Sequence, residues 1–151
     1  MDGVELLTWL RRHFSRGKSG NAMEVAWQEE DWRDLRPEER ELIERMLSEP
    51  FAGRDELLAQ LSGAKAKTID EDRCLSFQIT STVRADLPIR VPVTARSADE
   101  DGMFLEINIH VVDGRLHELE LWRGDLAPVQ RLPRASDLED FWIDPELLPG
   151  D

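Results

Sequence analysis

The sequence predicts an α+β fold in which N-terminal helices pack on a mostly antiparallel sheet of four to six strands. The first observation is a change of period: apolar residues at helical spacing up to residue 61 give way to alternating apolar and polar residues from residue 64. The second is a stretch at residues 103–122 with two alternating runs joined by a tight turn, which predicts a central hairpin. The third is length, since 151 residues suit one domain that buries roughly two-thirds of its unfolded surface.

Three helices are expected in the first part of the chain. Residues 3–15 place apolar side chains at roughly helical spacing, with basic residues at the C-terminal end, where cations suit the helix dipole. We expect this helix to dock on the domain, although a basic amphipathic helix also suits a membrane surface or a partner. Pro37 opens the next helix, which has acidic residues in its first turn and ends at Pro50. A shorter helix is expected from Gly53, with Gly63 as its stop.

The remaining elements are mostly strands. Besides the hairpin, the alternating pattern predicts strands at residues 64–69, 74–80, 89–96 and 127–131. Pro92 cannot donate a ladder hydrogen bond, so its strand is expected at a sheet edge or with a bulge. Residues 136–140 have the pattern of an N-capped helical turn, carrying Phe141 and Trp142.

The register of the hairpin decides which side chains face each other. A two-residue loop at Asp113 and Gly114 would place Ile107 opposite Glu120 and mix apolar with polar faces. A three-residue loop with Gly114 as a bulge places Ile107 opposite Leu119 instead. We therefore expect the three-residue loop.

This register sets two glutamates directly opposite each other. Glu106 would face Glu120, with Glu118 beside them, and like charges directly opposite repel. If the pair is purely structural, Arg90 or Arg96 on a neighbouring strand neutralises the carboxylates within the fold.

The same glutamates also suit two functional roles. In the first, the face binds a basic protein partner, with partner-binding residues Glu106, Glu118, Glu120, Trp122 and Phe104 as carboxylates and aromatic anchors. In the second, Glu106 and Glu120 act as general acid and general base in a hydrolase-like cleft.

Composition excludes several classes of function. A net charge of −13 argues against nucleic-acid binding, because phosphate contacts need clustered Lys and Arg. The same charge favours a basic partner or a cation, or simply keeps the protein soluble. The single cysteine, Cys74, rules out an intramolecular disulfide and argues against structural zinc. No apolar run reaches the roughly 20 residues of a membrane span and no signal peptide is recognisable, so we expect a cytoplasmic protein without membrane binding.

No motif predicts a metal site, a cofactor or catalytic residues. Residues 99–102 resemble the start of a calcium loop, but its later acidic ligands are missing and His110 stands where the bidentate glutamate belongs. His110 and His117 are expected on opposite faces of the hairpin and so would not share a metal. The Gly-Lys-Ser at residues 17–19 lacks the first glycine of a phosphate-binding loop.

Several motifs occur in a characteristic order: RPEERELIERML (36–47), FAGRDELLAQL (51–61), VP (91–92), DEDG (99–102), HVVDG (110–114), LEL (119–121) and LP (132–133). On these, the chain resembles a family of small bacterial proteins known only as a domain of unknown function. The resemblance covers residues 35–142 and implies two helices followed by a mostly antiparallel sheet. It implies no particular activity, because none is established for the family. Arg36 stands where a Ser or Thr helix cap is expected. Residues 1–33 are then a helical extension and 143–151 a loose tail.

We therefore expect a non-enzymatic interaction protein with an acidic and aromatic binding face. One concrete form is an immunity protein that neutralises a basic bacterial toxin. The alternatives are a small carboxylate-dependent enzyme using Glu106 and Glu120, and a regulatory protein whose N-terminal helix docks on a larger partner.

Overall fold

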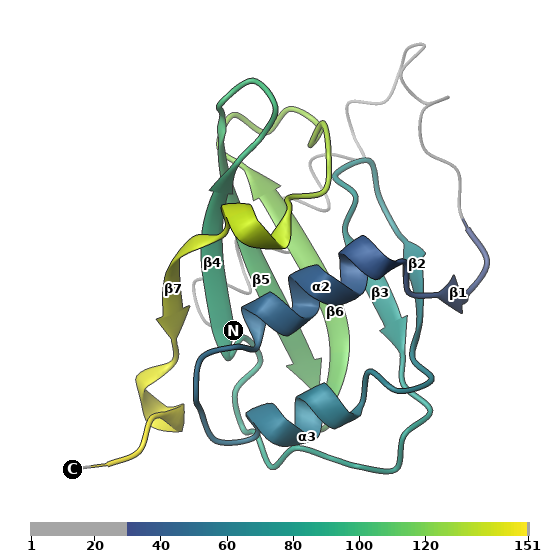
Figure 1. Cartoon of the computed structure of the whole chain (residues 1–151), viewed down its shortest axis with the longest axis vertical. Coiled ribbons are helices and arrows are strands. Elements are labelled where there is room, and N and C mark those ends of the chain that lie inside the picture. The colour runs from purple at the N-terminus through teal and green to yellow at the C-terminus, as the bar shows by residue number, and fades with distance from the viewer. Residues whose placement is uncertain (1–29, 151) are drawn as a thin grey trace.

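The computed structural model describes residues 30–150, and within them the chain forms one seven-stranded antiparallel sheet with two α-helices on the same face (Figure 1). The strand order across the sheet is β1-β2-β3-β6-β5-β4-β7. The elements along the chain are β1 (Arg33–Asp34), α2 (Pro37–Met46), α3 (Arg54–Ala59), β2 (Lys65–Thr68), β3 (Leu75–Gln78), β4 (Val93–Ala98), β5 (Phe104–Val112), β6 (Arg115–Arg123) and β7 (Glu139–Ile143), with short 3₁₀ helices at Ala135–Asp137 and Pro145–Leu147.

The predicted α+β class and antiparallel sheet are confirmed, but the expected four to six strands are too few and the helices are misplaced. Along the chain, both α2 and α3 come after β1 and before β2, so they are not N-terminal to the whole sheet. β1 has only two residues, too few to show an alternating pattern. The helical turn expected at residues 136–140 is present in part, as the 3₁₀ helix Ala135–Asp137, but Glu139–Ile143 then form β7 and pair with β4. The helix expected at residues 3–15 lies outside the described residues, and the division into 1–33, 35–142 and 143–151 stays a prediction.

The start of α2 shows how the chain manages without a Ser or Thr cap. Pro37 occupies the first helical position, and Glu39 reaches back to accept a hydrogen bond from the backbone N–H of Arg36 at 2.7 Å. The Glu39 carboxylate is buried, and the Arg33 guanidinium binds both of its oxygens, at 2.8 and 2.9 Å. This ion pair ties β1 to the helix.

The hairpin turn has two residues, so the prediction of a three-residue loop is wrong. Asp113 and Gly114 both have positive φ, 52° and 72°, as a type I′ turn requires. A bulge farther along β6 adds His117 to that strand. Because of this bulge, Leu116 lies on the same side as Leu119, and the apolar face stays intact with a two-residue loop.

Contacts from elsewhere in the chain select this turn. The carbonyl of Gly114 accepts hydrogen bonds from Gln60 Nε2 at 2.7 Å and from the backbone N–H of Ala85 at 3.0 Å. The Gln60 Oε1 atom in turn accepts from the backbone N–H of Leu116 at 2.9 Å. A Cβ at position 114 would collide with the Ala85 carbonyl, so glycine is required there for space as well as for its positive φ.

The observed register also corrects the predicted pairing of the glutamates. The facing pairs on the polar side of β5 and β6 are Glu106–Trp122, Asn108–Glu120 and His110–Glu118. Glu106 and Glu120 are therefore diagonal neighbours, so the repulsion expected between directly opposed carboxylates does not arise.

Two more strand predictions are corrected. Pro92 precedes β4, which is an interior strand between β5 and β7, so the edge alternative is wrong. A register shift does occur in the pairing of β4 with β7, between Thr94 and Arg96. Residues 127–131 form no strand, because the backbone N–H groups of Gln130 and Arg131 donate to the Asp99 carboxylate, at 2.8 and 3.3 Å.

The hydrophobic core lies between the helices and the sheet. Its fully buried side chains come from α2, α3 and the central strands, including Leu42, Ile43, Met46, Leu57, Leu105, Ile107, Ile109, Leu119 and Leu121. Cys74 is buried at the margin of this core, and burial raises the pKa of its thiol, so it is a packing residue. No helix within residues 30–150 is long and apolar enough to cross a membrane.

Candidate functional site

The sheet face opposite the helices carries a layer of polar side chains from β5 and β6. Because strand residues alternate, the neighbours of the core residues Leu105 and Ile107 point away from the helices. Four of the side chains on that face are nevertheless at most 3% exposed: Asn108, His110, Glu118 and Glu120. Buried carboxylates need hydrogen bonds or opposite charges around them. This face is therefore a built polar network.

His110 is oriented by an arginine from the loop before β4. Arg90 Nε donates to His110 Nδ1 at 3.1 Å, so Nδ1 is the acceptor and the ring proton sits on Nε2. That nitrogen lies 3.4 Å from Glu120 Oε1. Asn108 Nδ2 donates to the same carboxylate oxygen at 3.1 Å. Glu120 is thus held by an imidazole on one side and an amide on the other.

Three residues of this network lie close enough together to be potential ligands of a metal ion. His110, Glu118 and Glu120 each offer one ligand atom, all within 4.8 Å of one another, and this donor set suits a divalent transition ion. However, the bond from Arg90 uses the lone pair of Nδ1 and leaves Nε2 protonated. Neither ring nitrogen then has a lone pair for a metal, so the described arrangement does not fit one. The absence of a metal and of other cofactors stays a prediction.

A cleft of about 710 Å³ opens on this face beside the buried network. Its walls come from β4, β5, β7 and the segment before β4, and its charged side chains are Arg96, Glu106, Asp140 and Asp144. Trp142 of β7 lines it as well, half-exposed at 50%. The cleft therefore combines three carboxylates, one guanidinium and an accessible indole.

Asn108 connects the cleft to the buried network. Its Oδ1 accepts from Thr94 Oγ1 at 2.6 Å, which fixes the orientation of the amide. Its Nδ2 then donates to Glu106 Oε1 at 3.3 Å as well as to Glu120. Glu106 lies in the cleft and Glu120 behind it, so one amide positions both carboxylates.

Neither candidate arginine neutralises Glu106. Arg96 lies directly opposite it in the pairing of β4 with β5, but the Arg96 guanidinium sits over the Phe104 ring, 5.5 Å from its centroid. Arg90 is engaged with His110. Across residues 30–150, no ion pair joins Glu106 to a basic side chain.

The structure divides the predicted site residues into two groups. Glu106 lines the cleft, and Phe104 is 37% exposed and packs edge-to-face on Trp122, with ring centroids 6.1 Å apart. Glu118 and Glu120 are buried, so they shape the local potential without offering a contact surface.

Trp142, Asp140 and Asp144 are missing from the predicted site. Trp142 lies opposite Thr94, which places β7 along the cleft, and the register shifts by one residue where Asp140 has a φ of 51°. A mixture of acidic and aromatic residues at 140–144 was the available signal, but the capping pattern at residues 136–140 favours a helical turn.

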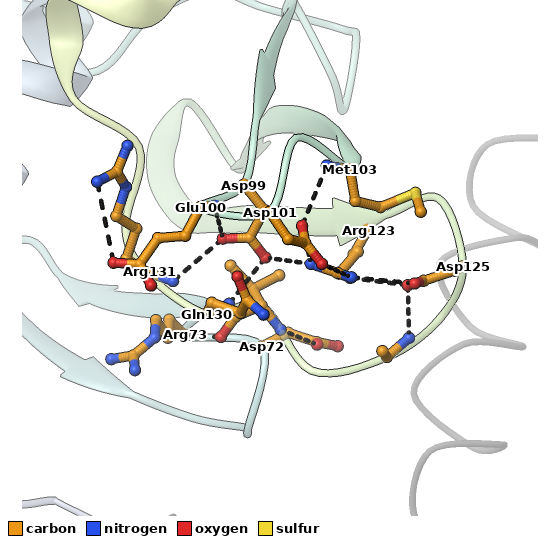
Figure 2. A network of polar contacts seen from close by, with 12 residues as sticks. Asp72, Arg73, Asp99, Glu100, Asp101, Met103, Arg123, Asp125, Gln130 and Arg131 are labelled. Atoms are coloured by element: carbon orange, nitrogen blue, oxygen red, sulfur yellow. Dashed lines mark hydrogen bonds and ion pairs between the residues drawn. The ribbon is translucent and has the colours of Figure 1, made fainter.

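A second acidic cluster, at the far end of β6, is internally compensated (Figure 2). The buried Arg123 guanidinium donates to three carboxylates, reaching Asp99 at 2.8 Å, Asp101 at 2.5 and 2.8 Å, and Asp125 at 2.8 and 3.0 Å. Asp99 also accepts backbone hydrogen bonds from Gln130 and from two other residues. The loop that resembles the start of a calcium site thus has a cation of the chain itself among its carboxylates.

The charges of this cluster stabilise each other. Hydrogen bonds from Arg123 lower the pKa of Asp101 and of Asp125. At Asp99 burial acts in the opposite direction, but hydrogen bonds from the backbone of Gln130 and from Arg123 outweigh it, so the pKa of Asp99 is lowered too. The three carboxylates in turn raise the pKa of Arg123.

Comparison with known proteins identifies a family but no activity. A family model described as "Domain of unknown function (DUF6984)" matches residues 32–133. No curated protein and no solved structure matches the chain.

Proposed function

Because the chain belongs to the family described as a domain of unknown function, DUF6984, which brings no activity with it, we propose a function from the geometry of the cleft. The protein is a non-enzymatic interaction protein, and the cleft beside Glu106 binds a basic segment of a protein partner. One observation carries this proposal: Glu106 lines an open cleft and forms no ion pair with a basic side chain of residues 30–150, because the Arg96 opposite it lies over Phe104.

Charge and exposure around the cleft support a basic partner. Asp140 and Asp144 add carboxylates to Glu106 along its walls. Trp142 in the cleft and Phe104, which lies under the cleft residue Arg96, expose aromatic surface, which is typical of the anchor points of protein interfaces. The net charge of −13 adds a long-range attraction that speeds the encounter with a cationic surface.

An immunity protein that neutralises a basic bacterial toxin in the cytoplasm is the concrete form of this proposal. Co-expression with the product of a neighbouring gene tests it, with co-purification and protection from growth arrest as readouts. We expect Glu106→Arg to abolish both, because it places a positive charge in the cleft. Glu44→Arg, on the exposed side of α2, is the matched control and should retain both. No complex and no protection by the wild-type chain would contradict this form of the proposal.

A carboxylate-dependent enzyme is the second candidate, favoured by the Asn108 amide that bridges Glu106 and Glu120 next to a cavity. Against it, Glu120 is 3% exposed and does not line the cleft. The double variant Glu106→Gln with Glu120→Gln separates the two. An enzyme loses turnover while its Tm is unchanged or raised, whereas an interaction protein shows no turnover in either form.

A further inference from the structure

We propose that the anchor which this cleft accepts is an arginine side chain of the partner, in preference to lysine. This inference rests on the proposed function and names the chemistry of the group bound. It depends on two features of the cleft, a carboxylate held in a fixed orientation and an exposed indole beside it.

The carboxylate of Glu106 is oriented before any partner arrives. Asn108 Nδ2 holds its Oε1 at 3.3 Å, and Asn108 is itself fixed by Thr94 at 2.6 Å and by Glu120 at 3.1 Å. Within residues 30–150, Glu106 Oε2 receives no hydrogen bond. A carboxylate held in this way can accept two parallel hydrogen bonds from a guanidinium. An ammonium acts as a point charge and does not match this paired geometry.

The indole of Trp142 supplies the second contact. Trp142 faces Thr94 across β7 and β4, and Thr94 faces Asn108 across β4 and β5. With strands about 4.8 Å apart, the backbones of β7 and β5 are separated by roughly 10 Å. Glu106 lies two residues from Asn108 on β5, and both Glu106 and Trp142 line the cleft. A guanidinium in the cleft can therefore stack on the indole and reach the Glu106 carboxylate at the same time. Stacking favours the weakly hydrated guanidinium over an ammonium.

Two arginines near the cleft already stack on aromatic rings. The Arg96 guanidinium lies over the Phe104 ring at 5.5 Å, and the Arg45 guanidinium over the Phe141 ring at 4.3 Å. Because Arg96 already lies over Phe104, the place for a second guanidinium in the cleft is beside Trp142, which lies opposite Thr94. Asp140 and Asp144, two residues before and after Trp142 in the chain, also line the cleft and add negative potential.

Titration calorimetry of the full chain at low salt tests this. The probes are capped peptides of alternating glycine and arginine, matched in length and charge by peptides of alternating glycine and lysine. We expect the arginine peptide to bind about tenfold more tightly. Trp142→Leu should remove most of that preference, whereas Trp32→Leu, which changes an indole of similar exposure next to β1, should keep it. Circular dichroism checks that both variants fold.

The outcomes separate the inference from the proposed function. Equal binding of the two peptides, or a preference that survives Trp142→Leu, overturns the arginine anchor while the basic-partner proposal stands. If neither peptide binds, both fail. A preference for arginine that depends on Trp142 and is lost in Glu106→Gln supports the inference.

Discussion

Two acidic regions of this molecule use similar residues in opposite ways. In the cluster at the end of β6, three aspartates surround the buried Arg123, and every carboxylate has a cation of the chain beside it. In the cleft, the only hydrogen bond that the Glu106 side chain accepts within residues 30–150 comes from the Asn108 amide, because Arg96, which lies opposite Glu106, is stacked on Phe104. A compensated carboxylate contributes to the fold, whereas one left without a cation next to an open cleft is available to a partner.

Arg123→Gln should have the largest effect, and it acts on stability. The change leaves Asp99, Asp101 and Asp125 close together without their shared cation, so they repel each other. We expect Tm to fall by roughly 10 °C. Thermal unfolding followed by circular dichroism measures it. Arg96→Gln, in the cleft, is the control and should change Tm by no more than about 2 °C. Equal losses in the two variants would erase the contrast between the regions.

The second largest effect should be a loss of stability at acidic pH, caused by the aspartates around Arg123. The pKa values of Asp99, Asp101 and Asp125 are lowered in the fold, so each stabilises the folded chain above the unfolded value, near pH 4. That stabilisation is lost as the pH falls through the lower folded values. Urea unfolding between about pH 5 and pH 2 should show the midpoint falling with pH, and Arg123→Gln should flatten this dependence. An unchanged slope in the variant would mean that Arg123 does not couple to these carboxylates.

Glu106→Gln should separate binding from stability. The amide keeps the side chain's shape and an oxygen that can accept from Asn108, but it removes the charge. We expect about tenfold weaker binding of the glycine–arginine peptide, with Tm unchanged or slightly raised. Calorimetry and thermal unfolding of the same samples provide both readouts. Glu44→Gln on α2 is the matched control for loss of one negative charge, and equal weakening there would point to net charge alone.

The smallest expected change is a gain of binding. Arg96 lines the cleft and its positive charge opposes an incoming cation. Arg96→Gln should therefore tighten the binding of the same peptide by about threefold, an effect that salt should reduce. Weaker binding in this variant would show that the Arg96 side chain is part of the contact surface.

The sequence pattern predicts the local elements of this fold well and their pairing less well. Helical spacing places α2 and α3, and strict alternation places β5, because both patterns depend on one apolar face that must be buried. The turn register depends instead on contacts of Gly114 with Gln60 and Ala85, which lie far away in the chain. A two-residue turn followed by a bulge satisfies the same alternation as the predicted three-residue loop.

For the candidate site, too, the sequence predicts local placement better than tertiary contacts. Alternation alone places Glu106 and Phe104 on the polar face, where the structure finds them at or near the cleft. It cannot tell that Glu118 and Glu120, on the same face, are buried, because burial of a polar face depends on what packs over it. Trp142 reaches the cleft only because β7 pairs with β4 as the last strand of the sheet.

By itself, then, the sequence determined the α+β class, the two described helices, the central hairpin and the acidic character of the protein, since each follows from local periodicity or composition. Only the tertiary structure decided which carboxylates have a cation. Arg123 and Arg96 look equivalent in the chain, but one is buried among three aspartates and the other lies on Phe104. The physical reason is that a side chain's partner is set by strand order and register, which bring together residues distant in sequence.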